Sequence, residues 1–234
     1  MAYRMPASRQ SNSSRSQTLD RGLSALTTIA ASDTPLTIDE VAALLGLGRS
    51  VTYRMIRTLE DHGLVKRDAT GRLTGGTQLV ALAGGVGNDM RVVAAPILAK
   101  LANSLGMTAF LVVSDGSEAV TAQVVEPTST AAHVAYRPGT RHALDRGAPG
   151  IALLAGEAPR KSERVEITQA RLSGWAYSEG EVIDGMASIA APVVASDGST
   201  RAALAVVHLA ADIDSLEVAP QVAEAAQCLG AGLT

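Results

Sequence analysis

The sequence has few cysteines, few aromatic residues and no long apolar run. Among its 234 residues Cys228 is the one cysteine, and aromatic residues make up 3%. A single cysteine excludes an intramolecular disulfide or a zinc site of several cysteines, and it fits the reducing cytoplasm, where we expect this protein. No apolar stretch approaches the roughly 20 residues that cross a bilayer. The sequence therefore predicts no membrane partner, and its Ser- and Arg-rich start predicts no secretory signal.

Motifs that carry catalysis or bind cofactors are also missing. The sequence contains no Gly-x-Ser-x-Gly nucleophile turn, no phosphate-binding loop and no dinucleotide fingerprint. Its four histidines show no close metal-ligand spacing. We therefore expect neither an enzyme nor a protein that holds a cofactor or a metal ion.

What the chain does have is an apolar core and an uneven distribution of charge. Hydrophobic residues make up 47% and charged residues 18% of the sequence. Residues 1–75 contain 10 Lys and Arg against 7 Asp and Glu, a net of +3, and residues 76–234 contain 10 against 16, a net of −6, which together give −3. A basic first part on an acidic remainder suits a DNA-binding head on a sensor body.

The first 17 residues contain basic and small polar side chains. Arg4, Arg9 and Arg15 lie among serines, with no acidic residue. We predict a flexible arm over residues 1–17, which either follows a phosphate backbone or is simply solvated. Regular structure is predicted from Leu19, where apolar side chains begin to recur at helical spacing.

Two further helices with a tight turn between them follow this first helix. Thr37 and Glu40 have the spacing of a capping box, in which the hydroxyl and the carboxylate each accept from the backbone amide of the other residue. That helix is predicted to end at Gly46, and the next to cover Arg49–Asp61. Two short strands around the polar turn 68–71 complete the order of a winged helix-turn-helix.

The Arg49–Asp61 helix is the predicted DNA-reading helix, because the second helix of this motif enters the major groove. Arginine can pair bidentately with guanine, which discriminates bases by about 1–3 kcal/mol, and hydroxyl side chains commonly hold phosphates. A solvated helix face is the alternative interpretation. The predicted DNA-binding residues are Arg49, Ser50, Thr52, Tyr53, Arg54 and Arg57 on the helix and Arg72 on the hairpin.

The remainder of the chain has the pattern of an α+β body with a mostly antiparallel sheet. Apolar residues broken by glycines predict a linker over residues 77–89. Helices are predicted at Met90–Leu105, Pro149–Leu154 and Val218–Leu229. Predicted strands are Thr108–Ser114, Ala119–Glu126, His133–Tyr136, Ala187–Val194 and Arg201–Leu209. The segment between the helix that ends at Leu154 and the strand that begins at Ala187 is predicted as a polar stretch.

Residues 19–75 resemble the IclR family of bacterial transcription regulators. The matching stretches are Leu19-Asp20-Arg21-Gly22-Leu23, Pro35-Leu36-Thr37, Gly46 to Arg54 and Thr58 to Val65. The resemblance continues less tightly through Met90–Gly106, Pro138–Ala155 and Gly174–Val193. It implies a winged helix-turn-helix DNA-binding domain over 18–76, the linker over 77–89, and an effector-binding and oligomerisation domain over 90–234. The family's fold in that second domain is a GAF-like antiparallel sheet flanked by helices.

The resemblance also implies a function. We expect a homodimer or homotetramer that binds an operator in double-stranded DNA, acts as a repressor, and responds to a small organic effector. The unpaired backbone amides at the start of the helix at 149–154 could receive a carboxylate. The pocket has few charged residues, which favours an otherwise apolar ligand. We therefore predict that the effector is an aromatic or short acyl acid or a derivative. By alignment with the family, the ligand-binding residues are Val134, His142, Leu144, Ala148, Pro149, Gly150, Ser178, Ser188, Ala205 and Val207.

Two features depart from the family pattern. Between Ala155 and Gly174 the chain has 18 residues, positions 156–173, where family members usually carry a longer helical insert. Ser188 replaces a frequent cysteine, and Ala205 and Val207 replace two serines. These departures leave an alternative function open, an architectural or partner-binding DNA-binding protein whose effector pocket is degenerate.

Overall fold

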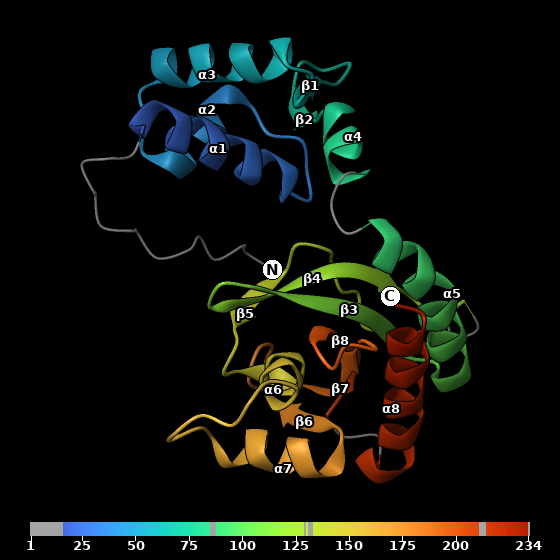
Figure 1. Ribbon diagram of the computed structural model, residues 1–234. Helices are drawn as coiled ribbons and strands as arrows, with labels where there is room; N and C mark the ends of the chain where they lie inside the picture. The colour runs from blue at the N-terminus through green and yellow to red at the C-terminus, as the bar shows by residue number, and fades with distance from the viewer. Residues whose placement is uncertain (1–15, 85–87, 129, 131–132, 211–213, 234) are drawn as a thin grey trace. The chain divides into compact units, whose positions relative to one another are not determined.

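The computed structural model describes residues 16–84, 88–128, 130, 133–210 and 214–233 (Figure 1). The predicted arm over 1–17 therefore lies outside the described residues, apart from its last two. The chain divides into two compact units, residues 1–86 and 87–234. Within the described part of the chain, no helix is both long enough and apolar enough to cross a membrane.

The first unit is a winged helix-turn-helix. Three helices, α1 (Gln17–Ala30), α2 (Ile38–Leu45) and α3 (Arg49–Asp61), are followed by an antiparallel hairpin of β1 (Val65–Arg67) and β2 (Leu73–Gly75). Side chains from all three helices and from both strands meet in one small core. Its buried residues are Ala25, Ile29, Val41, Ile56, Leu59, Val65 and Leu73.

Local sequence determines where α2 begins and ends. Thr37 Oγ1 accepts from Glu40 N at 3.2 Å, and Glu40 Oε2 accepts from Thr37 N at 2.6 Å, which confirms the predicted capping box. The helix ends at Gly46, whose φ of 62° lies in the left-handed region that glycine adopts without a Cβ clash. Only Leu47 and Gly48 separate this end from α3, so the turn of the motif is tight.

A further helix, α4 (Gln78–Gly84), follows β2 and lies within the segment 77–89 that the sequence predicts as a linker. The boundary between the two compact units, at 86/87, falls in the same segment. Val80 and Leu82 of α4 are exposed to solvent in the isolated chain. The segment thus includes a short helix with apolar side chains on its surface.

The second unit is a six-stranded antiparallel sheet with helices on both faces, so the predicted α+β class is confirmed (Figure 1). The strand order is β5-β4-β3-β8-β7-β6. The strands are β3 (Thr108–Asp115), β4 (Glu118–Val125), β5 (Arg141–Ala143), β6 (Ala176–Glu179), β7 (Met186–Val194) and β8 (Thr200–Leu209). The helices are α5 (Asn88–Leu105), α6 (Gly147–Ala155), α7 (Val165–Ser173) and α8 (Ser215–Ala231).

Alternation along the strands produces two cores, one on each face of the sheet, because successive side chains of a strand point to opposite sides. Leu111 of β3 and Val206 of β8 pack with α5 and α8. Their neighbours Phe110 and Val207 pack with α6 and α7. The second of these faces carries the candidate site of this unit.

Part of the predicted secondary structure is wrong. Residues 133–136 form no strand, and the strand that borders β4 is β5, a few residues later. The earlier segment meets the sheet through a side chain, since Thr108 Oγ1 donates to Val134 O at 2.5 Å. Pairing of the main chain with β4 begins at Gly139, whose N donates to Thr121 O at 2.7 Å.

Helix α7 and strand β6 are absent from the sequence-based prediction, which treats this region as a polar stretch. Only Ile167 and Ala170 of α7 are buried, so the helix carries too few apolar positions for a clear 3.6-residue period. Strand β6 has four residues, and two of them are buried. A strand this short gives a weak alternation signal.

Candidate functional site

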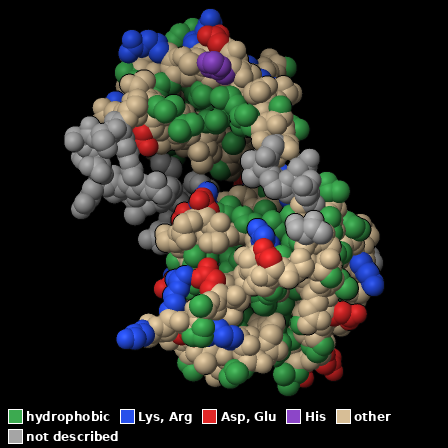
Figure 2. Space-filling view, viewed as in Figure 1, with side chains coloured by type: hydrophobic (Ala, Val, Ile, Leu, Met, Phe, Trp, Pro, Cys, Tyr) green, Lys and Arg blue, Asp and Glu red, His purple; other side chains and the backbone are tan. Residues whose placement is uncertain are grey.

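One face of α3 is exposed and basic. Met55, Ile56 and Leu59 are buried against the rest of the first unit. Figure 2 shows Lys and Arg side chains along the top of this unit, where Figure 1 places α3. The predicted residues that lie on the exposed face are Arg49, Ser50, Tyr53, Arg54 and Arg57.

Two arginines of this face have no partner in the described part of the chain. No hydrogen bond or ion pair joins the guanidinium group of Arg54 or of Arg57 to another described residue. Exposed guanidinium groups keep all their donors available, and their planar fork matches both phosphate oxygens and the guanine edge. This face can therefore bind a nucleic acid without first breaking an internal ion pair at these two positions.

One predicted DNA contact is wrong. Thr52 is fully buried, and its Oγ1 donates to Gly48 O at 3.3 Å. It lies three and four residues before Met55 and Ile56, so it shares their inward-facing side of the helix. The side chain of Thr52 stabilises the unit and does not face solvent.

Two other predicted DNA-binding residues are exposed but already paired within the unit. Arg49 forms an ion pair with Asp39. Arg72 donates to Pro35 O at 3.0 Å and lies 3.3 Å from Glu40 Oε2, the carboxylate that caps α2. Arg72 thus ties the hairpin to the start of α2, and any DNA contact by its side chain would compete with that link.

The hairpin also presents a basic residue that the sequence analysis missed. Lys66 of β1 is exposed and makes no hydrogen bond or ion pair with the residues described. Its neighbour Arg67 is held by Glu60, with Nε 2.7 Å from Oε1. The available signal was period-two alternation, because Val65 is buried and the next residue must point the other way.

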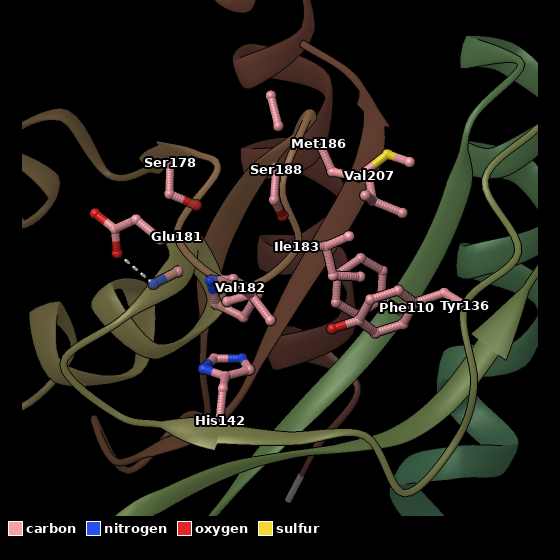
Figure 3. A pocket seen from close by; sticks show the side chains of 13 residues that line it. Phe110, Tyr136, His142, Ser178, Glu181, Val182, Ile183, Met186, Ser188 and Val207 are labelled. Carbon is pink, nitrogen blue, oxygen red and sulfur yellow. Dashed lines mark hydrogen bonds between the residues drawn. The ribbon is translucent and has the colours of Figure 1, made fainter. Parts of the chain in front are cut away.

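In the second unit a cavity lies between the start of α6 and the sheet (Figure 3). Its volume is about 30 Å³, which is room for about two water molecules. Phe110 and Tyr136 form one end, with ring centroids 4.6 Å apart. Burial raises the pKa of Tyr136, so its hydroxyl is protonated at neutral pH.

The structure brings half of the predicted ligand-binding residues together around this cavity. Those that line it are His142, Pro149, Ser178, Ser188 and Val207. The remaining five do not line it in this structure: Val134, Leu144, Ala148, Gly150 and Ala205. Ala205 is completely buried in the core, and a Cβ on Gly150 would lie 2.4 Å from Leu144 O, so these two residues are packed against protein.

The lining also includes residues that the prediction missed. They are Phe110, Tyr136, Gly147, Glu181, Val182, Ile183, Met186 and Ala187. Three of them, Glu181, Val182 and Ile183, belong to the segment between β6 and β7, which folds back over the start of α6 (Figure 3). Glu181 appears in the sequence only as part of the family resemblance, and no local pattern indicates that it reaches α6.

The first three positions of α6 offer no free amide. Gly147 N donates to Glu181 Oε2 at 2.7 Å, Ala148 N donates to Ser178 Oγ at 2.7 Å, and the next residue, Pro149, has no N–H group. Gly147 itself has a φ of 75°. Side chains of the chain itself thus occupy the amides of Gly147 and Ala148, so an effector carboxylate would have to displace them to bind there.

Glu181 is held from its other side by Arg164. Arg164 Nη2 lies 2.8 Å from Glu181 Oε1, and Nη1 lies 3.1 Å from Oε2. This guanidinium group, with further help from the Gly147 amide, holds the pKa of Glu181 below its usual range. The carboxylate is therefore ionised at neutral pH.

His142, on β5, is uncharged, unlike Glu181. Burial lowers the pKa of its imidazole, so the ring is neutral at pH 7. Its Nδ1 lies 3.0 Å from Ala143 O. Among the described residues that line the cavity, Glu181 is thus the one charged group.

A basic helix-turn-helix joined to a separate sheet-and-helix unit is the architecture of a two-domain DNA-binding regulator. Comparison with known families agrees with this class. Residues 18–69 match the IclR helix-turn-helix domain, and residues 159–230 match the bacterial transcriptional regulator IclR C-terminal domain. The chain belongs to the IclR family of transcriptional regulators, whose members are not enzymes.

Individual relatives cover most of the chain. The HTH-type transcriptional regulator XynR of Escherichia coli K12 is 27% identical over 231 residues, 87% of this chain and 90% of that protein. A crystal structure of an IclR transcriptional regulator from Alicyclobacillus acidocaldarius has a TM-score of 0.78 at 22% identity and covers 94% of this chain and 100% of that one. The structure of an IclR homolog from Microbacterium hydrocarbonoxydans, complexed with 4-hydroxybenzoate, has a TM-score of 0.78 at 20% identity. The match covers 93% of this chain and 99% of that one.

Proposed function

We propose that this regulator is a repressor that binds its operator through α3 and releases it in response to a small organic effector. In this proposal residues 18–76 bind DNA, 77–89 connect, and 90–234 bind the effector and oligomerise. The observation that supports the DNA-binding part is the exposed face of α3, on which Arg54 and Arg57 have no described partner. Arg54 and Arg57 would contact base edges or phosphates, and Ser50 and Tyr53 would hold phosphates.

The proposed assembly is a homodimer or homotetramer. Helix-turn-helix proteins commonly bind two half-sites about one DNA turn apart, which requires two copies of the motif. Leu19 and Leu23, one turn apart on α1, are 62% and 52% exposed in the single chain, and Val80 of α4 is 76% exposed. Apolar surface of this kind favours contact with a second copy.

The proposed effector is an aromatic or short acyl acid or a derivative. The cavity supports a small, mostly apolar ligand, and a structural neighbour is complexed with 4-hydroxybenzoate. A benzene ring exceeds about 30 Å³ of free space, so binding would require side chains to move. Val182, Ile183 and Met186 are apolar lining residues in the segment between β6 and the start of β7, and they are the first candidates for that movement.

A mobility-shift titration on the DNA upstream of the protein's own gene tests the DNA-binding part. We expect Arg54→Ala/Arg57→Ala to weaken specific binding at least about tenfold, since each bidentate arginine–guanine pair contributes about 1–3 kcal/mol. Arg160→Ala/Arg201→Ala removes the same charge from exposed ion pairs of the second unit and should bind as wild type does. Thr52→Val, a change inside the first unit, should also leave the affinity unchanged.

The outcomes of this titration distinguish DNA binding by α3 from binding by another element or by net charge alone. Specific binding that survived the Arg54/Arg57 double substitution would show that another element reads the DNA. Equal loss in the Arg160/Arg201 control would mean that net charge, and not α3, governs binding.

A thermal-shift screen with small organic acids and their neutral derivatives tests the effector part. A ligand that binds only the folded protein must raise its melting temperature. If the protein binds DNA but no compound raises its melting temperature, the alternative function is favoured, an architectural or partner-binding protein with a degenerate pocket. The small volume of the cavity is the observation that keeps this alternative under test.

A further inference from the structure

We infer that Glu181 makes this cavity select uncharged ligands, so that an amide or another neutral derivative of an aromatic or short acyl acid binds and the free carboxylate is rejected. This inference rests on the proposed effector role of the cavity. It narrows the proposed ligand class to one chemical form.

The first argument is that the positive end of α6 is already neutralised. A helix N-terminus attracts an anion through its unpaired amides and its dipole. Here the amides of Gly147 and Ala148 donate to Glu181 and Ser178, and Pro149 has no amide proton. A ligand carboxylate could therefore reach the amides of Gly147 and Ala148 only by displacing the side chains of Glu181 and Ser178.

The second argument is that no cation lines the cavity within the described residues. His142 is neutral, and Arg164 directs both of its Nη atoms to Glu181, with Nη1 also donating to Asp145 O at 2.6 Å. Arg146, just before α6, is exposed and does not line the cavity. Glu181 already pairs with Arg164, so an entering carboxylate would lie beside a negative charge and would have no cation of its own among the lining residues, and both conditions oppose its ionised form.

The third argument is that the polar groups of the cavity suit a neutral amide. Ser178 and Ser188 lie directly opposite each other on β6 and β7, so their side chains are on the same face of the sheet (Figure 3). Ser178 Oγ accepts from Ala148 N, and no described residue accepts its proton. Ser188 Oγ donates to Val206 O at 2.9 Å, which leaves its lone pairs to accept. One free donor beside one free acceptor matches the C=O and N–H groups of an amide.

Titration calorimetry on the full-length protein with matched acid and amide pairs tests this inference. The probes are 4-hydroxybenzoate with 4-hydroxybenzamide and butyrate with butyramide, at pH 7.5. We expect wild type to bind at least one amide about tenfold or more tightly than the matching acid, because the acid would bring a second negative charge next to Glu181.

Two variants assign this preference to Glu181. Glu181→Gln keeps an oxygen that can accept from Gly147 N but removes the charge, and it should narrow the ratio of the two affinities at least about tenfold. Glu166→Gln is the matched control, because Glu166 also pairs with Arg164, with Oε2 3.2 Å from Nε, but does not line the cavity. It should keep the wild-type ratio.

The outcomes separate this inference from the proposed function. If wild type binds an acid as tightly as its amide, the inference is overturned while the effector role stands. If wild type and Glu181→Gln bind neither member of either pair although wild type still binds DNA, the effector role fails for this ligand class and the inference fails with it. If Glu181→Gln does not fold, the test uses the ratio of amide to acid affinity in wild type together with Ser188→Ala. This variant should lose affinity for the amide and not for the acid.

Discussion

At the scale of the residue, the second unit places carboxylates and guanidinium groups in close pairs around α6 and α7. Glu163, just before α7, accepts from Arg171 through both of its oxygens, at 2.5 Å and 3.1 Å, and from the backbone amide of Arg160 at 3.2 Å. These contacts, led by the Arg171 guanidinium, lower the pKa of Glu163 from 4.5 to about 2. Glu163 therefore remains ionised in the fold at pH values where it would be protonated in the unfolded chain.

This shift predicts acid sensitivity that Glu163→Gln reduces. A carboxyl group whose pKa is lower in the folded state stabilises the protein above its unfolded pKa, and that contribution disappears as the pH falls through the folded pKa. Between pH 4.5 and about 2, the melting temperature of wild type should fall more steeply than that of Glu163→Gln. Thermal denaturation followed by circular dichroism at several pH values measures both curves.

The control for this experiment is Glu224→Gln, which removes an equal charge from an exposed position of α8. Its curve should run parallel to that of wild type. If Glu163→Gln and wild type lose stability equally between pH 4.5 and 2, the contacts around Glu163 do not stabilise its ionised form.

At the scale of the element, the capping box of α2 predicts a measurable loss of stability. Thr37→Ala removes the hydroxyl that accepts from Glu40 N, and loss of such a cap costs about 0.5–2 kcal/mol. The free energy of unfolding from urea denaturation, followed by circular dichroism, should fall by about that amount. Thr27→Ala, in the interior of α1, should not destabilise, because alanine has the higher helix propensity. Equal effects of the two substitutions would remove the cap as the explanation.

Elements that carry their own local signals could be predicted from the sequence. Helix α3 begins and ends where its apolar period and its flanking glycines predict, at Arg49 and Asp61. The strand predicted at 133–136 failed because strand pairing depends on a distant partner, and here the main chain of 141–143 pairs with β4. Helix α7, with two buried residues, gives almost no periodic signal.

The candidate sites also divide into features with a local sequence signal and features that depend on distant parts of the chain. The exposed side of α3 could be predicted from helical spacing, apart from Thr52, a polar residue that lies within the buried stripe. The lining of the cavity could be predicted only in part, because it depends on a loop. Glu181 and its neighbours lie in an irregular segment, and only the folded chain brings that segment to the start of α6.

At the scale of the whole molecule, the two compact units have separate cores, and this predicts that they respond separately to denaturant. Trp175 is the one tryptophan and packs against a core of the second unit. Thr37→Ala should therefore leave the urea midpoint of Trp175 fluorescence unchanged while it shifts part of the circular dichroism transition. If both signals shift together, the two units unfold as one cooperative body.

The sheet of the second unit is a single layer of backbone with side chains on both sides. Along β7, Ser188 lines the cavity, and the next residue, Ile189, is completely buried in the core that α5 and α8 cover. Phe110 and Leu111 of β3 divide in the same way. A change in the width of the cavity thus displaces the same strands that support α5 and α8. Substitutions made to enlarge the cavity will consequently alter the packing beneath those two helices, because the two cores are separated only by the backbone of the sheet.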